Sequence, residues 1–284
     1  MSCFVLSKVG LPWLMPFILG ITIGYSQSLP IVAAPSAPQV LTLENSANRL
    51  TGTISPGELV TISGSALGPS SPGKGGVFTI NEAGSIDSNL QGVRVLFDNI
   101  PGTPIYVSST QINLVVPWEI AGKVSTSVIV EYNGVQSLPL IIRVDDVTPG
   151  VFTVDGSGRG LAAAVNQDGT VNGPFPKFTP GFQPALAGSV VAVYLTGGGQ
   201  TTPPGVTGSV NPINQLLRIT SQVTATVGGK PAVVEFLGAA PGIVNGVLQM
   251  NILVPGGFTG ISVVPLEILI NAVPVQGAIG IAVG

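Results

Sequence analysis

Histidine is absent from this sequence, and cysteine occurs once, at Cys3. Without histidine, Ser-His-Asp and Cys-His nucleophilic systems are excluded, as are histidine-based metal sites. Because the single cysteine lies near the N-terminus, the rest of the chain has no disulfide of its own and must be stabilised by packing. The sequence also lacks the G-x-x-x-x-G-K-[ST] phosphate loop, and its glycine-rich GSGRG and TGGGQ segments are typical of turns.

Charged residues are scarce, at 8% of the 284 residues against about 25% in an average soluble domain. The 10 basic and 13 acidic side chains form no basic patch, so nucleic acid is not an expected partner. Mean hydropathy is high, at +0.57. Beyond the N-terminus, however, no apolar run approaches the roughly 20 residues of a membrane-spanning helix. We therefore attribute the hydrophobicity to buried strands.

The N-terminus has the pattern of a secretory signal peptide. Lys8 precedes the apolar stretch VGLPWLMPFILGITIG, and the small residues Gly24 and Ser26 fit cleavage after Ser26. We expect residues 1–26 to be removed on export and the mature chain to be secreted, at the cell surface or periplasmic. A retained membrane anchor is the alternative interpretation.

Glycine and proline are abundant, with 39 and 25 residues, beside many Val, Ile and Thr. This mixture predicts an all-β protein of short strands joined by tight turns. We expect strands at 59–62, 93–97, 190–195 and 223–227. The second and fourth are followed by the turns Asp98-Asn99 and Gly228-Gly229.

Two heptads, QINLVVP (111–117) and QMNILVP (249–255), are nearly the same and lie 138 residues apart. The offset persists beyond them, in Gly122 with Gly260 and Asn133 with Asn271. This pattern indicates an internal duplication, and each copy has the size and strand rhythm of an immunoglobulin-like sandwich. We predict a linker and entering strand at 27–52, a first sandwich at 53–147, and a second at 148–284 with an N-terminal hairpin and a Pro/Phe-rich loop.

The heptads themselves predict amphipathic strands that end at a proline. Amides occupy one face, apolar side chains occupy the other, and proline cannot continue the ladder. The residues concerned are Gln111, Asn113 and Pro117 in the first copy and Gln249, Asn251 and Pro255 in the second. We interpret the amides as structural, bonding a crossing loop; gripping a sugar hydroxyl is the alternative.

Between the copies, the sequence predicts strands at 151–154 and 161–165, a turn at Asp168-Gly169 and a brief return strand. A Pro-rich loop then carries Phe175, Phe178 and Phe182.

Several segments resemble a known family. YVSSTQINLVVPWEIAG (106–122), PGVFTVDGSGRGLAAAVNQDGTVN (149–172) and GSVVAVYLTGGGQTTPP (188–204) are similar to the Solibacter-type uncharacterised C-terminal domain of acidobacterial secreted proteins. ISPGELVTISGSALGP (54–69) resembles the start of IPT/TIG-type immunoglobulin-like domains. The resemblance implies an exported β-sandwich module with no established activity and no catalytic residues to transfer. The loop after Asn172 is longer and more aromatic than the family pattern.

Oxygen ligands and paired carboxylates were weighed as candidate chemistry. Asp145, Asp146, Asp155, Asp168 and Glu119 could in principle supply a glycosidase pair, but turn and junction positions explain them better. Asp155, Asn166 and Asp168 are weak calcium candidates, because calcium needs six to eight oxygens. No metal or other cofactor is therefore expected.

Aromatic side chains are the best candidates for binding. Phe175, Phe178 and Phe182 could present an apolar tip to a partner or glycan, or could plug the junction between the sandwiches. Trp118 could stack on a sugar or cap the sandwich end, and the second copy has Gly256 in its place.

We therefore expect an exported, non-enzymatic tandem immunoglobulin-like protein with a structural or adhesive role. Its partner would be a protein or a polysaccharide at the cell surface, and edge strands would favour self-association. A carbohydrate-binding module that uses the exposed aromatics is the alternative, and an unrecognised enzyme is a third. The short segment from Asp145 to Gly150 suggests that the two sandwiches are docked.

Overall fold

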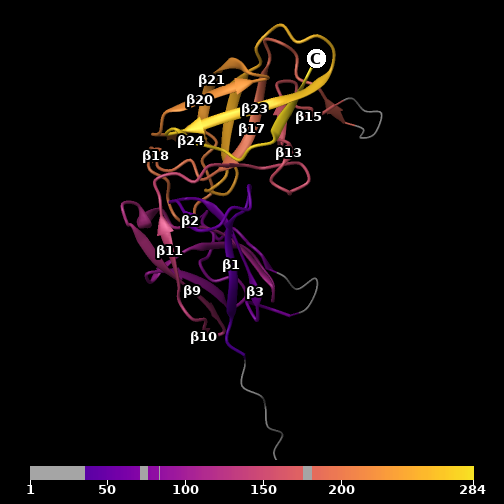
Figure 1. Ribbon diagram of the computed structural model, residues 1–284. Helices are drawn as coiled ribbons and strands as arrows, with labels where there is room; N and C mark the ends of the chain where they lie inside the picture. Colours follow the sequence, from indigo (N-terminus) through magenta and orange to yellow (C-terminus); the bar gives the residue numbers. More distant parts are fainter. Residues whose placement is uncertain (1–35, 71–75, 83, 175–180) are drawn as a thin grey trace, which may run out of the picture. The chain divides into compact units, whose positions relative to one another are not determined.

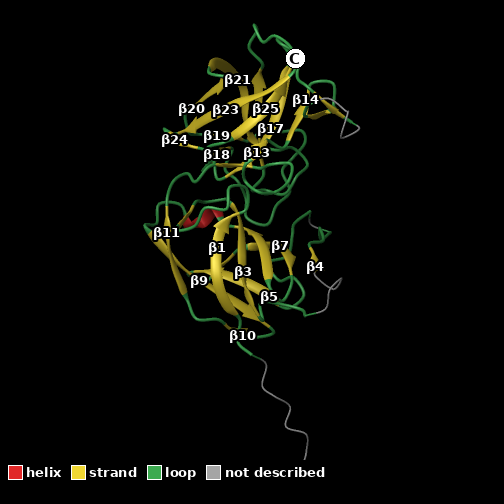
Figure 2. Ribbon diagram, turned by 45° about the vertical axis from the view of Figure 1, so that its right-hand side comes forward, coloured by secondary structure: helices red, strands yellow, loops and turns green. Residues whose placement is uncertain are grey.

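The computed structural model describes residues 36–70, 76–82, 84–174 and 181–284. In these residues the protein is all-β, as predicted, and its only helical element is the 3-10 turn η1 (Trp118–Ile120), drawn red in Figure 2. No helix within them is long and apolar enough to cross a membrane. Residues 1–26, for which we predict a signal peptide, lie outside the described residues.

The first sandwich consists of two sheets that enclose one apolar core. One sheet has the order β1 (Gln39–Asn45), β3 (Leu59–Ser65), β8 (Gln111–Val115), β7 (Thr103–Val107) and β4 (Gly76–Val77). The other has the order β2 (Thr53–Ile54), β11 (Leu140–Val144), β9 (Ser125–Tyr132), β5 (Val93–Phe97) and β6 (Ile100–Pro101), with β10 (Val135–Gln136) beside β9. Ile62, Phe97, Ile112, Leu114 and Val130 are fully buried between them.

The second sandwich is built on one long, continuously hydrogen-bonded path of strands (Figure 1). Along this path the strands are β13 (Gly160–Leu161), β25 (Ile279–Val283), β23 (Ser262–Ile270), β20 (Val223–Val227), β21 (Lys230–Ala239), β22 (Leu248–Leu253), β17 (Val190–Thr196), β14 (Ala164–Asn166), β15 (Val171–Asn172) and β16 (Phe182–Gln183). Four short strands attach to it: β12 (Gly150–Val151), β18 (Thr201–Thr202), β19 (Arg218–Ile219) and β24 (Val273–Pro274). Its core contains Leu195, Met250, Ile252, Ile268 and Ile281.

Equivalent strands make equivalent pairs in the two sandwiches, so the predicted duplication is confirmed. The order β3-β8-β7 recurs as β17-β22-β21, and β11-β9-β5 recurs as β25-β23-β20. Even the bulge between Pro104 and Tyr106 recurs between Val234 and Phe236, at an offset of 130 residues. The offset grows to 138 at the heptads because the loop between β21 and β22, residues 240–247, is longer than its counterpart between β7 and β8, residues 108–110.

The long strand β21 explains why the second sandwich has one continuous path and the first has two sheets. Its first residues pair with β20, and its later residues pair with β22. In the first sandwich the same stretch is interrupted at Gly102 and gives two strands, β6 and β7, which pair with β5 and β8 respectively.

The predicted hairpin after the first sandwich was only partly correct. Pairing at 151–154 is limited to β12 and one bridge at Thr153, and the expected strand 161–165 is divided into β13 and β14. The division occurs because β13 pairs in parallel with β25, whereas β14 pairs with β17. The chain therefore changes partners at Ala162-Ala163, which a hydrophobic pattern does not reveal.

Both predicted two-residue turns are confirmed. Asp98 and Asn99 have φ of 49° and 71°, and Gly228 and Gly229 have φ of 58° and 75°. Positive φ at both central residues matches the twist of the flanking strands in a tight hairpin.

Equivalent core positions of the two sandwiches should contribute similarly to the free energy of unfolding. We expect Ile112→Ala in β8 and Met250→Ala in β22 each to lower the free energy of unfolding by about 2–5 kcal/mol, because both side chains are fully buried. Urea unfolding followed by circular dichroism measures this loss. Ile141→Ala, at a side chain 67% exposed, is the control and should change stability by less than about 0.5 kcal/mol. A loss confined to one of the two core variants would contradict the equivalence.

Candidate functional site

A third apolar cluster, which we call the junction cluster, draws on both sandwiches. The first sandwich supplies Leu59, Ile86 and Val115, and the second supplies Val244, with Phe152, Val210 and Val247 packed around them. Residues 35–284 accordingly form one compact unit. This arrangement supports the docking that the short connecting segment suggested.

Hydrogen bonds cross the same region. The Leu59 N–H donates to Thr196 Oγ1 at 2.7 Å, and that hydroxyl donates to the Gly246 carbonyl at 2.7 Å. The Ile86 N–H donates to the Gly208 carbonyl at 2.7 Å. Since buried polar groups are costly when unpaired, these bonds fix the relative position of the loops that carry them.

The loop after β1 grips the segment that connects the sandwiches. Asn45 Oδ1 accepts from the Ala47 and Asn48 N–H groups at 2.8 and 3.1 Å, which shapes the loop. The side-chain amide nitrogens of this loop bond the connecting segment. Asn45 Nδ2 donates to the Thr148 carbonyl, and Asn48 Nδ2 donates to the Pro149 carbonyl. One asparagine-rich loop thus holds the connecting segment by its backbone.

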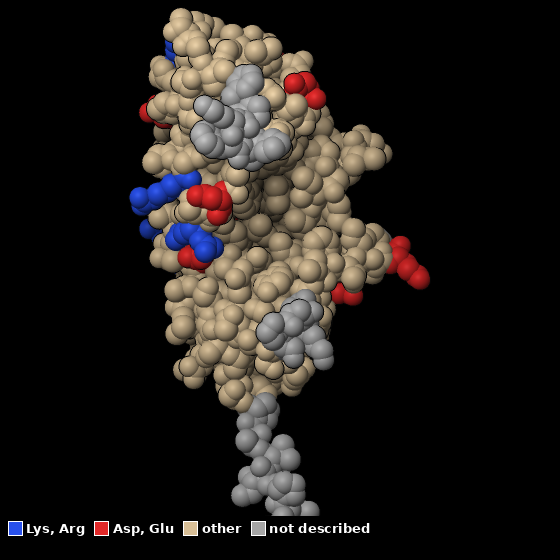
Figure 3. Space-filling view, turned by 90° about the vertical axis from the view of Figure 1, so that its right-hand side faces the viewer, with Lys and Arg blue, Asp and Glu red and all other residues tan. Residues whose placement is uncertain are grey.

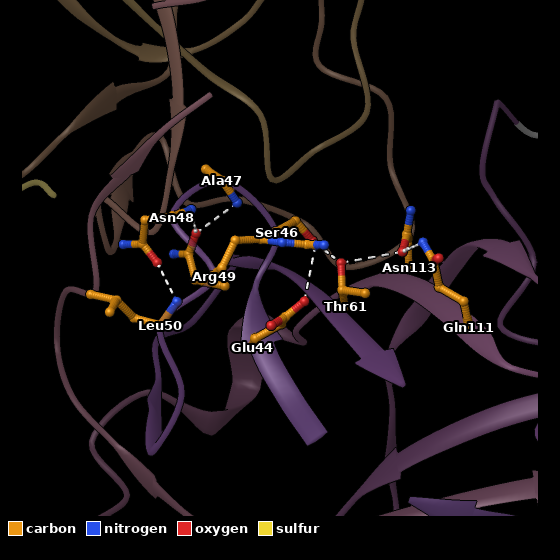
Figure 4. A network of polar contacts seen from close by, with 10 residues as sticks. Glu44, Ser46, Ala47, Asn48, Arg49, Leu50, Thr61, Gln111 and Asn113 are labelled. Atoms are coloured by element: carbon orange, nitrogen blue, oxygen red, sulfur yellow. Dashed lines mark hydrogen bonds and ion pairs between the residues drawn. The ribbon is translucent and has the colours of Figure 1, made fainter. Parts of the chain in front are cut away.

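The first heptad is joined to this loop by a chain of polar contacts (Figure 4). Gln111 Nε2 donates to Asn113 Oδ1 at 2.8 Å, and Thr61 Oγ1 donates to the same oxygen at 3.2 Å. Thr61 in turn bonds Ser46 in the loop, at 2.8 Å.

The second heptad repeats the amide pair, since Gln249 Nε2 donates to Asn251 Oδ1 at 2.8 Å. In both copies the two amides bond each other along the strand, and no bond to a crossing loop is seen in the described residues. The strands β8 and β22 end at Val115 and Leu253, shortly before Pro117 and Pro255, as predicted.

One turn occurs in both copies, and the junction buries it in the first copy only. In the first copy, Ser55-Pro56-Gly57-Glu58 closes with a Glu58 N–H to Ser55 C=O bond, and Leu186 to Ser189 closes in the same way in the second. All four residues of the first turn are buried, whereas Leu186 is 65% exposed. Only the first turn therefore lies under the other sandwich.

Glu58 is the one acidic side chain that is fully buried among the described residues. Its Oε2 accepts from the Ser55 N–H at 2.7 Å and from Thr148 Oγ1 at 2.6 Å, while Oε1 has no partner. Burial raises the pKa of Glu58 from 4.5 to about 8, although hydrogen bonds from Thr148 and Ser55 lower it in part. The carboxyl group is therefore largely protonated at neutral pH.

Trp118, a candidate sugar-stacking ring in the sequence, is buried in the junction and only 7% exposed. A Cβ on Gly57 would lie 2.2 Å from its ring and a Cβ on Gly205 would lie 2.3 Å from it, so one glycine of each sandwich packs on the indole. The backbone N–H of Trp118 donates to Thr207 Oγ1 at 3.0 Å, whereas the buried indole Nε1 has no hydrogen-bond partner among the described residues. The ring as placed offers no exposed face for stacking, because the second sandwich covers this end of the first.

The phenylalanine loop is described only in part. Phe175 and Phe178 lie outside the described residues, and Phe182 in β16 is half-buried against Gly173. Their role in binding stays a prediction. Ser71-Pro72-Gly73-Lys74, whose Ser-x-x-Lys spacing also occurs in serine–lysine enzymes, likewise lies outside the described residues.

The calcium candidates each bond within their own turn. Asp155 Oδ1 accepts from Thr153 and Ser157, and Asp168 Oδ1 accepts from Thr170. These hydrogen bonds hold the pKa of both carboxyls below the usual value.

Asn166 Oδ1 is likewise engaged, accepting from Asn172 Nδ2 at 2.9 Å. No group of three Asp, Glu, Cys or His side chains suited to a metal occurs in the described part of the chain. Among the described residues, no hydrogen bond or ion pair links the turn of Asp155 to that of Asp168.

The other carboxylates considered for catalysis also make structural contacts. Asp145 accepts from Thr53 Oγ1 and Arg143 Nε, each at 2.8 Å, and Glu119 accepts from Thr207 Oγ1 at 2.7 Å. Sequence reasoning missed Glu58. The available signal was the pair of aligned turns, in which the first copy has an acid where the second has Ser189.

Comparison with known proteins identifies the first sandwich. Residues 45–140 match the sequence model of the IPT/TIG domain family, so the expected IPT/TIG-like domain is confirmed there. The match leaves the second sandwich outside it, and the narrower Solibacter-type resemblance stays a prediction. No curated protein was found to match the chain.

Two solved structures share a distant likeness in fold. One is the Bacteroides ovatus mixed-linkage glucan utilization locus SGBP-B in complex with a mixed-linkage heptasaccharide, with 13% identity, a TM-score of 0.30, and coverage of 79% of this chain and 38% of that one. The other is a Bacteroides thetaiotaomicron protein of unknown function, with 12% identity, a TM-score of 0.25, and coverage of 84% and 47%. The chain thus spans less than half of either protein, and likenesses this distant indicate no ligand for it.

Glu58 should make stability depend on pH. Its pKa in the folded chain, about 8, exceeds the usual 4.5, so the folded chain retains a proton that the unfolded chain releases. The stability contributed is full below about pH 4.5 and is lost as pH rises through about 8, by at most about 5 kcal/mol. We expect Glu58→Gln to flatten this fall, so that it is more stable than the natural chain at about pH 9.

Urea unfolding at several pH values measures the effect. Glu235→Gln, at an exposed glutamate of β21, is the matched control and should leave the pH profile unchanged. Parallel pH profiles for the natural chain and Glu58→Gln would show that Glu58 is ionised when buried.

The packing of Trp118 predicts strong coupling to Gly205. Gly205→Ala should destabilise by about 1–3 kcal/mol through overpacking, and Trp118→Ala by about 3–5 kcal/mol through the cavity left. In the double variant the added methyl group fills part of that cavity. The loss of stability in the double variant should therefore be smaller than the sum of the two single losses by more than about 1 kcal/mol. A double-mutant cycle measured by urea unfolding tests this, and strict additivity would contradict the contact.

Proposed function

We propose that this chain is an exported, non-enzymatic module whose two docked immunoglobulin-like sandwiches serve a structural or adhesive role at the cell surface or outside the cell. The observation that carries the proposal is the junction. Glu58, Trp118 and the junction cluster are buried where the two sandwiches pack together. Fixed orientation of two domains suits presentation of surfaces to a partner.

The chemistry of the surface supports the same proposal. Four of the candidate catalytic carboxylates, Asp145, Asp155, Asp168 and Glu119, bond hydroxyls, backbone or arginine in their own neighbourhoods. IPT/TIG domains are generally non-catalytic, and residues 45–140 carry one. On the face drawn in Figure 3 most of the surface is uncharged; acidic and basic side chains adjoin along its left side, and a few acidic side chains stand apart on its right. Such a surface favours an uncharged partner over nucleic acid.

Export is the first part to test. We expect the full chain, expressed in a bacterial host, to leave the cytoplasm and to begin at Gln27 after cleavage, because Gly24 and Ser26 fit the cleavage site. Mass spectrometry of the fractionated protein gives its N-terminus. A chain that keeps residues 1–26 and stays in the membrane fraction would instead support the anchor interpretation.

The adhesive role is tested with the exported product. We expect it to co-sediment with isolated cell envelopes or insoluble polysaccharides, and Trp118→Ala, with a loosened junction, to be retained less. Failure to bind either material, with the fold verified by circular dichroism, would contradict adhesion.

A further inference from the structure

A groove lined by both polar and aliphatic side chains opens where the two sandwiches meet, and we call it the seam groove. It has a volume of about 420 Å3 and is lined by the loop after β1, the end of β11, the connecting segment and the turn between β23 and β24. Small-molecule sites usually range from about 300 to 1,000 Å3, so the groove has room for a compact ligand of one or two rings. Its walls come from both sandwiches, so it exists only while they are docked.

One side of the groove is a fixed charged pair. Asp145 is held from two directions, by Thr53 Oγ1 and by Arg143 Nε, each at 2.8 Å. Arg143 uses only its Nε in this contact, and within the described residues its two terminal amino groups have no hydrogen-bond partner. The guanidinium is therefore oriented and still has donors to offer.

Two further polar side chains of the groove are unpaired. The Asp146 carboxylate and the Asn271 amide line it, both residues are exposed, and neither side chain bonds another described residue. Asp146 comes from the connecting segment, whereas Asn271 comes from the β23–β24 turn of the second sandwich. The groove thus offers acceptors and donors from separate elements.

The remaining wall is aliphatic. Leu50, 61% exposed, and Val273, 39% exposed, line the groove together with Pro274. Exposed aliphatic side chains beside polar groups suit a ligand with hydroxyl groups on its edge and C–H groups on its faces.

Charge and size narrow the class of ligand. One guanidinium stands against two carboxylates, Asp145 and Asp146, so the groove has a net negative charge that disfavours phosphates and acidic sugars. A carboxylate accepts from two neighbouring hydroxyls, and Arg143 and Asn271 donate to others. We propose that the seam groove binds a neutral saccharide of one or two sugar units, either free or at the end of a polysaccharide chain.

This inference deepens the proposed function, because it rests on the exported module and names a neutral saccharide as its partner. It differs from the aromatic platform expected from the sequence, since no aromatic side chain lines the groove. If no sugar binds the seam groove, adhesion through a protein partner still stands as the proposed function. Failure of the saccharide proposal and failure of the adhesive role are distinguishable, because binding to cell envelopes and binding to sugars are assayed separately.

The probes are glucose, N-acetylglucosamine, cellobiose, maltose and xylobiose, titrated into the exported chain by calorimetry. We expect at least one to bind with a dissociation constant of about 1 mM or tighter. Asp146→Asn and Asn271→Ala should each weaken it about tenfold, because each removes hydrogen bonds to the ligand. Glu235→Gln, which changes charge outside the groove, is the control and should bind as the natural chain does.

Two results would overturn the proposal. One is the absence of heat change and of ligand-observed NMR saturation transfer for every probe. The other is binding that Asp146→Asn and Asn271→Ala leave unchanged while both variants remain folded. If the preferred sugar binds and also displaces the chain from an insoluble polysaccharide, the ligand is a chain end; if it binds without such retention, the ligand is the free sugar.

Discussion

The burial of one turn, Ser55 to Glu58, under the second sandwich is the constraint on which the rest of this structure depends. An immunoglobulin-like sandwich normally leaves the ends of its sheets to water. Here one end is covered, so the turn needs partners from the other domain. Thr148 supplies a hydroxyl to Glu58, Thr196 supplies one to the Leu59 N–H, and Gly205 leaves room for Trp118. The connecting segment has its path because the loop after β1 holds its carbonyls.

The buried carboxyl group of Glu58 makes the docking of the two sandwiches depend on pH. A protonated carboxyl is tolerated in the junction, whereas an ionised one would be separated from water with a single well-paired oxygen. The contact between the sandwiches is therefore strongest in acidic surroundings and weakens as pH rises through about 8. The same docking creates the seam groove, whose lining residues are brought together only by the junction. The fixed orientation of the sandwiches, the protonation of Glu58 and the seam groove thus all result from the burial of one end of the first sandwich.

Much of the fold could be read from the sequence because short-range patterns encode it. The strands at 93–97 and 223–227, the turns after them and the prolines that end the heptads follow from alternation and local backbone geometry. The repeated heptads predicted two sandwiches. The separation of β13 from β14 could not be read, because it depends on which distant strand, β25 or β17, offers an edge.

The site was harder to predict for the same reason. Trp118 next to Gly256 in the alignment of copies indicated asymmetry, but only the docked structure shows that the tryptophan fills space against Gly205. Glu58 reads in sequence as an ordinary turn carboxylate, and its burial is decided by residues about 90 positions away. The groove was hardest of all to predict from the sequence, because Asp146 and Asn271 line it from elements that no local pattern links.

The unequal ends of the two copies have a consequence for assembly. A module that packs the end of one domain against the flank of the next makes a head-to-tail contact, and such contacts propagate into fibres when every end is alike. Here the second copy has Ser189 and Gly256 where the first has Glu58 and Trp118, and its turn at Leu186 is open to solvent. The end that would receive another copy lacks the residues that form the contact. Duplication followed by divergence has thus left the residues that pack against a neighbouring sandwich in the first copy alone.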